Sequence, residues 1–452
     1  MPKSNYINFI IPFFIINIFF LFKDTSRDYE ITFLLILLLI IICFSINKHF
    51  QSDSSIGISS FIVFNYLFFY IAPIIQIQNL SVQNYTLINT LPFDKNLALK
   101  ALFSIIIFNV LFFYFYYKFK KKIIQKKETI NLIDSDKLKK IILFLLILSI
   151  FIVPLLFFYN ENTGFEDSKP IQMFFKKFIF FIPVLPALYY VRYKNQTAFL
   201  LLLISILLIV FFKNPFFEKR NALGPIYLTL LTFFFPSFEK SNIKSFILIL
   251  LSLLVIFPLL TIITHTQGLQ EKYGLNYAIY SNFNLKEIFF DTFNRLHYDS
   301  FSNLMASIHY FYENGIIYGN QLLGSILFFF PRVFWIEKPL PSGMEIGNYL
   351  IDNHAMWFNI ISMPIVGEGW LNFGILGVIL FAIILAFLLV YFEKWIESPD
   401  FLKKVVGIYF SFHMIYILRG DLMTAIAFFI GPSLAFYILP KFLNNFVKSK
   451  NL

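Results

Sequence analysis

The chain has 452 residues, of which 58% are hydrophobic, 21% are aromatic and only 14% are charged. A soluble protein usually carries about 25% charged and roughly 45–50% apolar residues, so this composition excludes a water-soluble globule. The single cysteine, Cys43, excludes a disulfide framework and a cysteine-ligated metal site. The hydrophobic residues form blocks long enough to cross a bilayer core of about 30 Å, which predicts an all-α, polytopic membrane protein.

About twelve transmembrane helices are expected from the hydropathy of the chain. The apolar runs are continuous and do not alternate with a period of two, so they are not the strands of a barrel. Helices are the remaining way to satisfy backbone polar groups in lipid. In chain order, the expected spans are residues 6–22, 31–46, 56–75, 97–117, 141–159, 178–191, 197–212, 225–236, 245–264, 369–392, 404–418 and 422–439.

The distribution of lysine and arginine predicts that both termini lie in the cytoplasm. With the N-terminus inside, the inner segments hold 21 of the 37 basic residues, the short outer loops 11 and one long loop five. Such an excess is typical of cytoplasmic loops. The basic run at residues 118–127 is then an anchor against anionic lipid. Its position accounts for much of the net charge of +11 without a nucleic-acid partner.

The spans divide the chain into three parts: helices one to nine at residues 1–264, a large outer loop at 265–368, and helices ten to twelve at 369–452. The loop is too long for a simple connector. Four of the six histidines and three of the four tryptophans fall between residues 265 and 377. This concentration of polar and aromatic chemistry predicts that the functional site is carried by the loop.

Two helical pieces are predicted inside the loop. Residues 285–313 show an amphipathic pattern, and Gly315 follows as a helix stop. Residues 320–335 are apolar but too short to span a bilayer comfortably, and the run contains Pro331, which indicates a re-entrant or interfacial helix. No internal repeat is visible, so an inverted-repeat transporter is not supported.

Arginine is distributed differently from lysine. Five of the six arginines are expected on the outer side: Arg27, Arg220, Arg295, Arg332 and Arg419. The planar guanidinium grips phosphate or carboxylate with two donors at once, which a lysine cannot do. The alternative is ordinary snorkelling of long cationic side chains at the membrane interface.

Residues 324–343 (GSILFFFPRVFWIEKPLPSG) and 363–377 (MPIVGEGWLNFGILG) carry a resemblance to a known family. They resemble the long outer loop of the Wzy-type polymerases that join the repeat units of O-antigen and capsule. Arg332 is followed by ten residues and then Gly343, as in an arginine-x10-glycine motif of that loop. Residues 219–224 (KRNALG) resemble an arginine-bearing loop between earlier spans, although no glycine follows Arg220 at the same spacing.

The resemblance implies an enzyme of a bacterial cytoplasmic (inner) membrane that acts on the outer leaflet. Its substrates would be oligosaccharide repeat units on undecaprenyl diphosphate. The growing glycan would be transferred from its lipid diphosphate onto a hydroxyl of the next lipid-linked unit. The resemblance implies no metal and no cofactor, and the expected partners are the lipid-linked substrate, membrane lipid and a possible chain-length regulator protein.

The resemblance also assigns expected roles to individual residues. A base is needed near the acceptor hydroxyl, and positive charge is needed at the departing diphosphate. Glu368 or His354 would be the base. The diphosphate and the sugar rings would be bound by cationic and aromatic residues, namely Arg332, Arg295, Arg220, Lys338, Arg419, Trp335 and Trp370.

Each role has a structural alternative. Arg332 can cap a helix end, Glu368 can mark a helix N-terminus, and Arg419 can form a local ion pair with Asp421. Two other functions also stay open. A ligase of the O-antigen type would use the same donor but attach it to a lipid A core, and a transporter would place charged or helix-breaking residues in mid-membrane.

Overall fold

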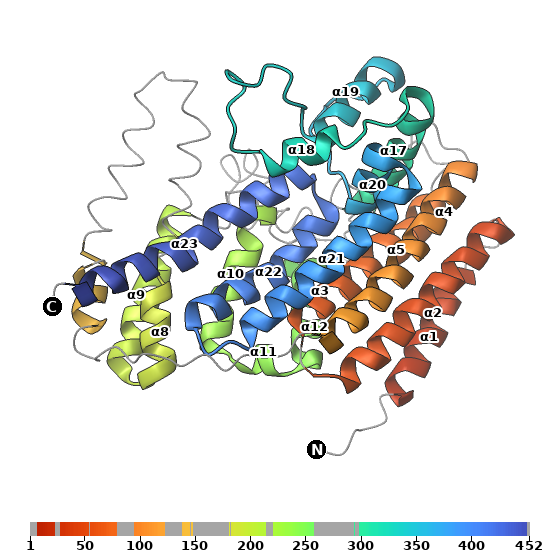
Figure 1. The fold of residues 1–452 in the computed structure, drawn as a ribbon. Coiled ribbons are helices and arrows are strands. Elements are labelled where there is room, and N and C mark those ends of the chain that lie inside the picture. Colours follow the sequence, from red (N-terminus) through yellow and green to blue (C-terminus); the bar gives the residue numbers. More distant parts are fainter. Residues whose placement is uncertain are drawn as a thin grey trace, which may run out of the picture. The chain divides into compact units, whose positions relative to one another are not determined.

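The computed structural model describes residues 7–22, 28–53, 55–78, 95–122, 138–144, 146–147, 180, 182–213, 220–256, 293 and 298–449. Within these residues the protein is helical and contains no strand, which confirms the all-α class (Figure 1). Five helices are long and apolar enough to cross a membrane, namely Tyr29–Gln51, Ile56–Ile77, Lys95–Lys121, Ile375–Ile396 and Phe401–Arg419. The protein is therefore membrane-embedded. The expected total of twelve spans stays a prediction, because most of the fifth (141–159) lies outside the described residues.

The chain divides into two compact units. Unit 1 comprises Met1–Ile123, Phe238–Val390 and Met414–Ile426. Its helices, some of which continue into unit 2, are α1 (Ile7–Phe22), α2 (Tyr29–Gln51), α3 (Ile56–Phe64), η1 (Asn65–Ile71), α4 (Ala72–Gln78), α5 (Lys95–Lys122), α11 (Ser237–Lys240), α12 (Asn242–Leu251), η6 (Ser252–Ile256), α17 (Ser300–Asn314), α18 (Asn320–Ile326), α19 (Ser342–His354), α20 (Ile365–Phe373), α21 (Ile375–Ile396), α22 (Phe401–Arg419) and α23 (Leu422–Ser449).

Unit 2 comprises Ile124–Ser237, Tyr391–His413 and Ala427–Leu452. It holds α8 (Val184–Tyr193), α9 (Gln196–Phe212) and α10 (Arg220–Phe234), together with the end of α21, the first part of α22 and most of α23. Aromatic rings pack these last segments together, as in Phe392 and Phe410, whose ring centroids are 4.1 Å apart. The hydroxyl of Tyr409 on α22 donates to the carbonyl of Phe428 on α23 at 2.7 Å.

The centre of unit 1 is the continuous helix Ile56–Ile77. In its most apolar stretch, 94% of the helix is buried inside the protein. A helix enclosed in this way can carry polar side chains if other helices satisfy them. The Oγ atoms of Ser59 and Ser245 are 2.8 Å apart, and Asn109 Nδ2 donates to Asn65 Oδ1 at 2.7 Å. These bonds connect the helix to α12 and α5 through its interior rather than through a surface loop.

Contacts inside unit 1 show that α2 and α5 begin side by side and also end side by side. Where α2 and α5 begin, Lys95 Nζ lies 2.7 Å from Asp28 and 2.6 Å from Glu30. Where both helices end, Lys48 Nζ lies 3.5 Å from the ring centroid of Tyr117. The two helices are therefore parallel, as the alternating topology requires of the second and fourth spans. Which of the two ends faces the cytoplasm stays a prediction.

Three helices of the long loop (α17, α18 and α19) and α20 pack on the other helices of unit 1 at the end where α5 begins. Lys100 Nζ of α5 lies 3.8 Å from the ring centroid of Tyr312 on α17. The indole N–H of Trp370 on α20 donates to Ser104 Oγ of α5 at 2.9 Å. Figure 1 shows α18 and α19, in teal to light blue, at this end of the unit. The loop is thus a packed layer over the helix ends.

The structure describes the second helix expected in the loop and the end of the first, of which residues 285–292 and 294–297 lie outside the described residues. α17 runs from Ser300 to Asn314 and ends at Gly315, whose φ of 82° is in the left-handed region that glycine tolerates, so the predicted stop is confirmed. The helix expected at residues 320–335 is shorter: α18 ends at Ile326 and turns follow. Pro331 has no N–H to continue a helix, and the Lys338 ammonium takes the carbonyls of two preceding residues, Phe328 and Phe330.

Candidate functional site

An acid–base cluster of four side chains lies on α17 and α19 in the long loop. His309 and Glu313 are four residues apart on α17 and therefore share a face of that helix. His309 Nε2 lies 3.2 Å from Glu313 Oε1. Tyr349 of α19 donates its hydroxyl to the other carboxylate oxygen of Glu313, and the ring nitrogen Nε2 of His354 lies 3.3 Å from that hydroxyl oxygen. We call these four residues the histidine cluster.

The histidine cluster is partly exposed, and its surroundings keep His354 in the neutral form. The side chains of His309 and Glu313 are 21% and 49% exposed. Desolvation and the neighbouring His309 lower the pKa of His354, so its imidazole is neutral near pH 7 and can take up a proton. Burial, the hydrogen bond to Glu313 and the charge of that carboxylate raise the pKa of the Tyr349 hydroxyl, which keeps it a hydrogen-bond donor.

A second set of contacts fixes the helices that carry the cluster. Glu345 of α19 accepts a hydrogen bond from the hydroxyl of Tyr310 on α17 at 3.0 Å and another from the amide of Gln321 on α18. Beneath them, Ala306, Ile346, Leu350 and their neighbours form a buried hydrophobic core. The positions of the cluster residues therefore depend on packed helices and not on a free loop.

A buried carboxyl pair lies where α19, α20 and the turn between α22 and α23 meet. Glu368 has no exposed surface. Its Oε2 accepts from Ser342 Oγ at 2.7 Å and its Oε1 from the backbone N–H of Leu422 at 2.9 Å. The neighbouring Asp421 accepts from the backbone N–H groups of Gly343 at 3.2 Å and Thr424 at 2.8 Å. Each carboxyl thus binds the first residues of α19 and of α23.

The pair is a candidate for proton storage more than for direct contact with a substrate. Burial, followed by the charge of Asp421, raises the pKa of the Glu368 carboxyl, and burial raises the pKa of Asp421 as well. Two carboxyls this close disfavour double ionisation. Because Glu368 is fully buried, a substrate could reach it only after the segments around it had moved.

The flanking glycines of Glu368 serve packing between helices. A side-chain Cβ on Gly367 would come within 2.7 Å of Met363 Sδ and 3.0 Å of Ser307 Oγ, and one on Gly369 would come within 2.6 Å of the backbone nitrogen of Val378. The space beside both glycines is filled by Met363, α17 and α21, which leaves no room for a substrate against the backbone at these positions.

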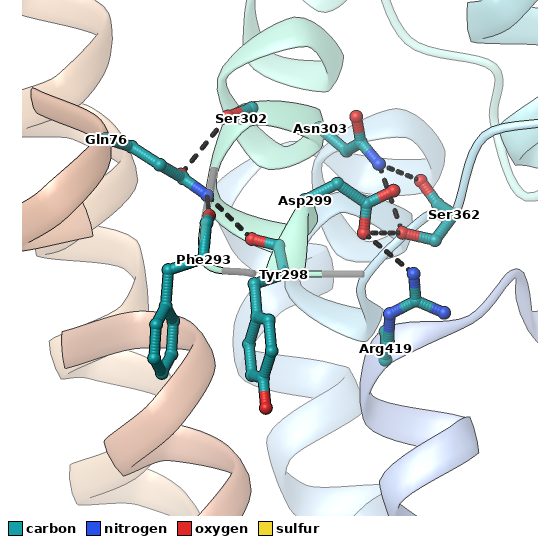
Figure 2. A network of polar contacts seen from close by, with 8 residues as sticks. All are labelled: Gln76, Phe293, Tyr298, Asp299, Ser302, Asn303, Ser362 and Arg419. Atoms are coloured by element: carbon teal, nitrogen blue, oxygen red, sulfur yellow. Dashed lines mark hydrogen bonds and ion pairs between the residues drawn. The ribbon is translucent and has the colours of Figure 1, made fainter. Parts of the chain in front are cut away.

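A third polar network connects the turn at Arg419 to α17 (Figure 2). The Arg419 guanidinium lies 3.2 Å from Asp299 Oδ1, which also accepts from Ser362 Oγ at 2.7 Å. Asn303 Nδ2 donates to the carbonyl of Ser362 at 2.7 Å. Arg419 therefore pairs with Asp299, 120 residues away in sequence, and the expected local ion pair with Asp421 is not the contact that forms.

Gln76 extends this network to the central helix. Its amide nitrogen donates to the carbonyls of Phe293 at 3.0 Å and Tyr298 at 2.8 Å, and its Oε1 accepts from Ser302 Oγ at 3.3 Å (Figure 2). The start of α17 is thereby held by the end of Ile56–Ile77.

Arg332 and Lys338, both expected to bind diphosphate, use their donors within the loop. The Arg332 guanidinium donates to the carbonyls of Lys338 and Pro339. The Lys338 ammonium donates to the carbonyl of Phe328 at 2.6 Å and to that of Phe330 at 2.9 Å. Desolvation, followed by repulsion from Arg332, lowers the pKa of the Lys338 ammonium. The two cations stabilise the turns that follow α18.

The remaining predicted site residues are scattered. Trp370 is 7% exposed, with its indole N–H bonded to Ser104, a position that fits packing better than stacking on a sugar. Trp335 is partly exposed in the turns after α18. Arg220 is the first residue of α10 in unit 2, and its side chain is outside the described part of the structure. Arg295 lies outside the described residues altogether.

An apolar cavity of about 530 Å³, open like a surface groove, lies between the first turns of α2 and α5. Its lining residues are Tyr29, Glu30, Phe33, Leu34, Leu99, Lys100 and Phe103. The ammonium of Lys100 also lies over the ring of Tyr312. Tyr312 directly precedes Glu313 of the histidine cluster, so Lys100 connects the cavity with the neighbourhood of that cluster. A cavity of this kind suits an alkyl or polyprenyl chain.

Comparison with known proteins gives no relative: no protein-family model, no curated protein and no solved structure matches the chain. Within the described residues, no group of three or more His, Cys, Asp or Glu side chains could hold a metal ion. The chemistry of the site therefore has to be inferred from its own side chains.

Sequence reasoning named His354 and Glu368 but missed their partners. The spacing of His309 and Glu313 was a usable signal, since i and i+4 positions meet on a helix. Tyr349, Ser342 and Asp299 gave no such signal. Their roles depend on contacts between segments that are dozens of residues apart, such as the 63 residues between Asp299 and Ser362.

Proposed function

We propose that the protein polymerises undecaprenyl-diphosphate-linked oligosaccharide repeat units in the synthesis of O-antigen or a capsular or exopolysaccharide. The observation that carries the proposal is the partly exposed histidine cluster on the loop layer of a membrane-embedded helical protein. Transfer between two lipid-linked substrates needs an acid–base group that can be reached at a membrane surface, and the proposal places the cluster there. The likeness of residues 324–343 and 363–377 to the outer loop of Wzy-type polymerases supports the same reading.

In the proposed reaction, the oxygen of the acceptor hydroxyl attacks the anomeric carbon of the donor glycan. The bond between that carbon and the diphosphate oxygen breaks, and undecaprenyl diphosphate leaves with the bonding electron pair. The hydroxyl proton passes to the neutral imidazole of His354. Tyr349 and Glu313 orient that imidazole through the hydrogen bonds described above.

The donor lipid would lie in the cavity between α2 and α5, with its diphosphate near Lys100. Lys100 and Glu30 both line this cavity, and the Lys100 ammonium also contacts Tyr312 of the loop, so it can attract the departing diphosphate. Arg332, Arg295, Arg220 and Arg419 stay predictions for this role. Glu368 would act as a positioning residue that fixes α19, the helix of His354 and Tyr349.

The proposed location is a bacterial cytoplasmic membrane, with both termini in the cytoplasm and the histidine cluster on the outer face. The proposed partners are the lipid-linked oligosaccharide, membrane lipid and a protein that regulates chain length. No nucleic-acid partner is proposed.

The test uses purified protein in vesicles with lipid-linked glycans extracted from a strain that lacks it. We expect the wild type to convert single repeats into a ladder of longer lipid-linked glycans, measured by mass spectrometry. His354→Gln should lose on the order of 10²-fold or more in rate, as when a general base is removed. Asp352→Asn, an exposed position on the same helix, is the matched control and should retain normal turnover.

Other outcomes separate the alternatives. Transfer to lipid A core without any ladder would indicate a ligase. Movement of the glycan across the vesicle membrane without a new glycosidic bond would indicate a transporter. A normal ladder from His354→Gln would reject the histidine cluster as the base and leave Glu368 as the candidate.

A further inference from the structure

The turns between α18 and α19 expose a dense set of large apolar side chains. We call residues 326–336 the apolar loop. Val333 and Phe334 are each 77% exposed and Ile336 is 86% exposed. The other exposed apolar side chains of the loop are Ile326, Phe329 and Phe330. A patch of this kind on an ordinary water-facing surface would be costly, and it marks an interaction site.

Part of the backbone of the apolar loop is bonded by the loop and its flank. Lys338 takes the carbonyls of Phe328 and Phe330, and Arg332 takes those of Lys338 and Pro339. Backbone N–H groups of Phe330, Phe334, Trp335 and Lys338 bond to carbonyls of the same segment. These bonds lower the cost of placing the groups involved in the apolar part of a bilayer.

The ends of the apolar loop are fixed to unit 1. Gly324 of α18 lies so close to Pro339 that an added Cβ would come within 2.5 Å of the proline ring, and within 3.0 Å of Met423 Cε. The two ends of the loop therefore meet on a rigid base. The base lies at the end of unit 1 where α5 begins, because Leu322 of α18 bonds Asn372 of α20 and Trp370 of α20 bonds Ser104 of α5.

Charge at the loop selects the partner. The guanidinium of Arg332 belongs to an exposed residue in the middle of the apolar loop, which is followed by the exposed Glu337 and the buried Lys338. A guanidinium beside apolar side chains matches the phosphate layer and the upper acyl region of a bilayer, and Trp335 is of the residue type enriched at that depth. A membrane leaflet is also close to the loop, because helices of the same unit are long and apolar enough to cross a membrane.

We propose that the apolar loop inserts into the interface of the membrane leaflet at this end of unit 1, with its phenylalanine, valine and isoleucine side chains among the upper acyl chains and Arg332 at the phosphates. The loop is then a monotopic anchor that supplements the spanning helices and holds the α17–α19 layer close to the lipid surface. The proposal holds whether or not the protein is a polymerase.

Site-directed fluorescence in lipid vesicles tests the insertion. The only native cysteine, Cys43, is buried, and replacing it with serine leaves a background in which Val333→Cys can be labelled with an environment-sensitive fluorophore. We expect blue-shifted emission at position 333, strong quenching by phospholipids that carry a doxyl group near the headgroup, and little quenching by aqueous iodide. Asp352→Cys, exposed on α19 of the same loop, is the matched control and should show the opposite pattern.

Every outcome decides the proposal. Quenching of the label at position 333 by iodide and not by doxyl lipid would place the loop in water and overturn it. Protection from both quenchers would mean that protein covers the loop, either a second copy or another partner, and would also overturn it. Ile336→Cys provides an independent second position. The readout needs no turnover, so it is unaffected if the proposed polymerase activity fails its own test.

Discussion

The buried carboxyl of Glu368 makes the free energy of unfolding depend on pH. Its carboxyl accepts hydrogen bonds from Ser342 and Leu422 and lies beside Asp421. Because its pKa in the folded protein is raised above the ordinary 4.5, the folded state holds the proton more tightly than the unfolded chain does. The contribution of this group to the free energy of unfolding is therefore greatest below about pH 4.5. It decreases above that pH and is lost as the pH rises through the folded-state pKa.

Glu368→Gln should remove that loss. The amide is neutral at every pH, and it can still accept from Leu422 while its NH₂ group donates to Ser342. We expect the melting temperature of the variant in detergent to exceed that of the wild type above neutral pH, with the difference shrinking towards pH 4.5. Glu337→Gln, at an exposed position, should follow the wild-type pH profile. Identical profiles for Glu368→Gln and the wild type would reject the burial effect.

Single residues could be predicted in part. The crowding of histidine and acidic residues in one loop led to His354 and Glu368, because polar side chains are conspicuous in an apolar chain. Their surroundings could not be predicted, since Leu422 lies 54 residues from Glu368. Arg332 was read as a diphosphate ligand from its type, and only the positions of two carbonyls show that its fork is engaged by the backbone.

At the scale of elements, α19 depends on close approach to the segment that follows it. A Cβ on Gly343 would come within 2.1 Å of the Ile361 carbonyl oxygen, and one on Gly347 within 2.1 Å of the Asn359 carbonyl oxygen. At the other end of α19, Ala355 has a φ of 52°, a left-handed conformation that suits glycine better than alanine. The two ends of one helix thus predict opposite responses to alanine and glycine.

Gly343→Ala should destabilise the protein by about 1–3 kcal/mol or more, the usual range for overpacking. Ala355→Gly is the matched reverse exchange and should be neutral or stabilising by up to about 1 kcal/mol, because it relieves the left-handed strain. Thermal unfolding of both variants in detergent measures the difference. A Gly343→Ala protein as stable as the wild type would mean that α19 does not pack on residues 359–361 as described.

Elements were predictable where lipid acts as the solvent. Continuous apolar runs of suitable length gave correct helices at α2, the helix Ile56–Ile77, α5 and α21, because a bilayer leaves the backbone no alternative. The same argument failed for residues 320–335. There, α18 has only seven residues. Pro331 inside the run and the contacts of Lys338 outside it favour turns, and a hydropathy profile does not report side-chain contacts of that kind.

For the whole molecule, the contacts of unit 1 make the topology testable. Asp53 lies at the end where Asn242 Nδ2 donates to the carbonyls of His49 at 2.6 Å and Ser52 at 3.1 Å. α17 contacts α5 through Lys100, near the other end of α5. Reporter fusions at Asp53, Lys127 and Leu452 should therefore report the cytoplasm, and a fusion at Asn320 should report the outside. A cytoplasmic signal at Asn320 would place the histidine cluster on the wrong face for the proposed reaction.

The central helix Ile56–Ile77 imposes an order in time on the making of the protein. The amide of Gln76 bonds Phe293, Tyr298 and Ser302, partners that are 217, 222 and 226 residues further along the chain. A ribosome adding ~5–20 residues per second delivers them on the order of 10–40 s after the helix itself. During that interval the inserted helix carries polar groups that lipid cannot satisfy. Biogenesis must therefore shelter this helix, within the insertion machinery or against its neighbours, until the second half of the chain has been synthesised.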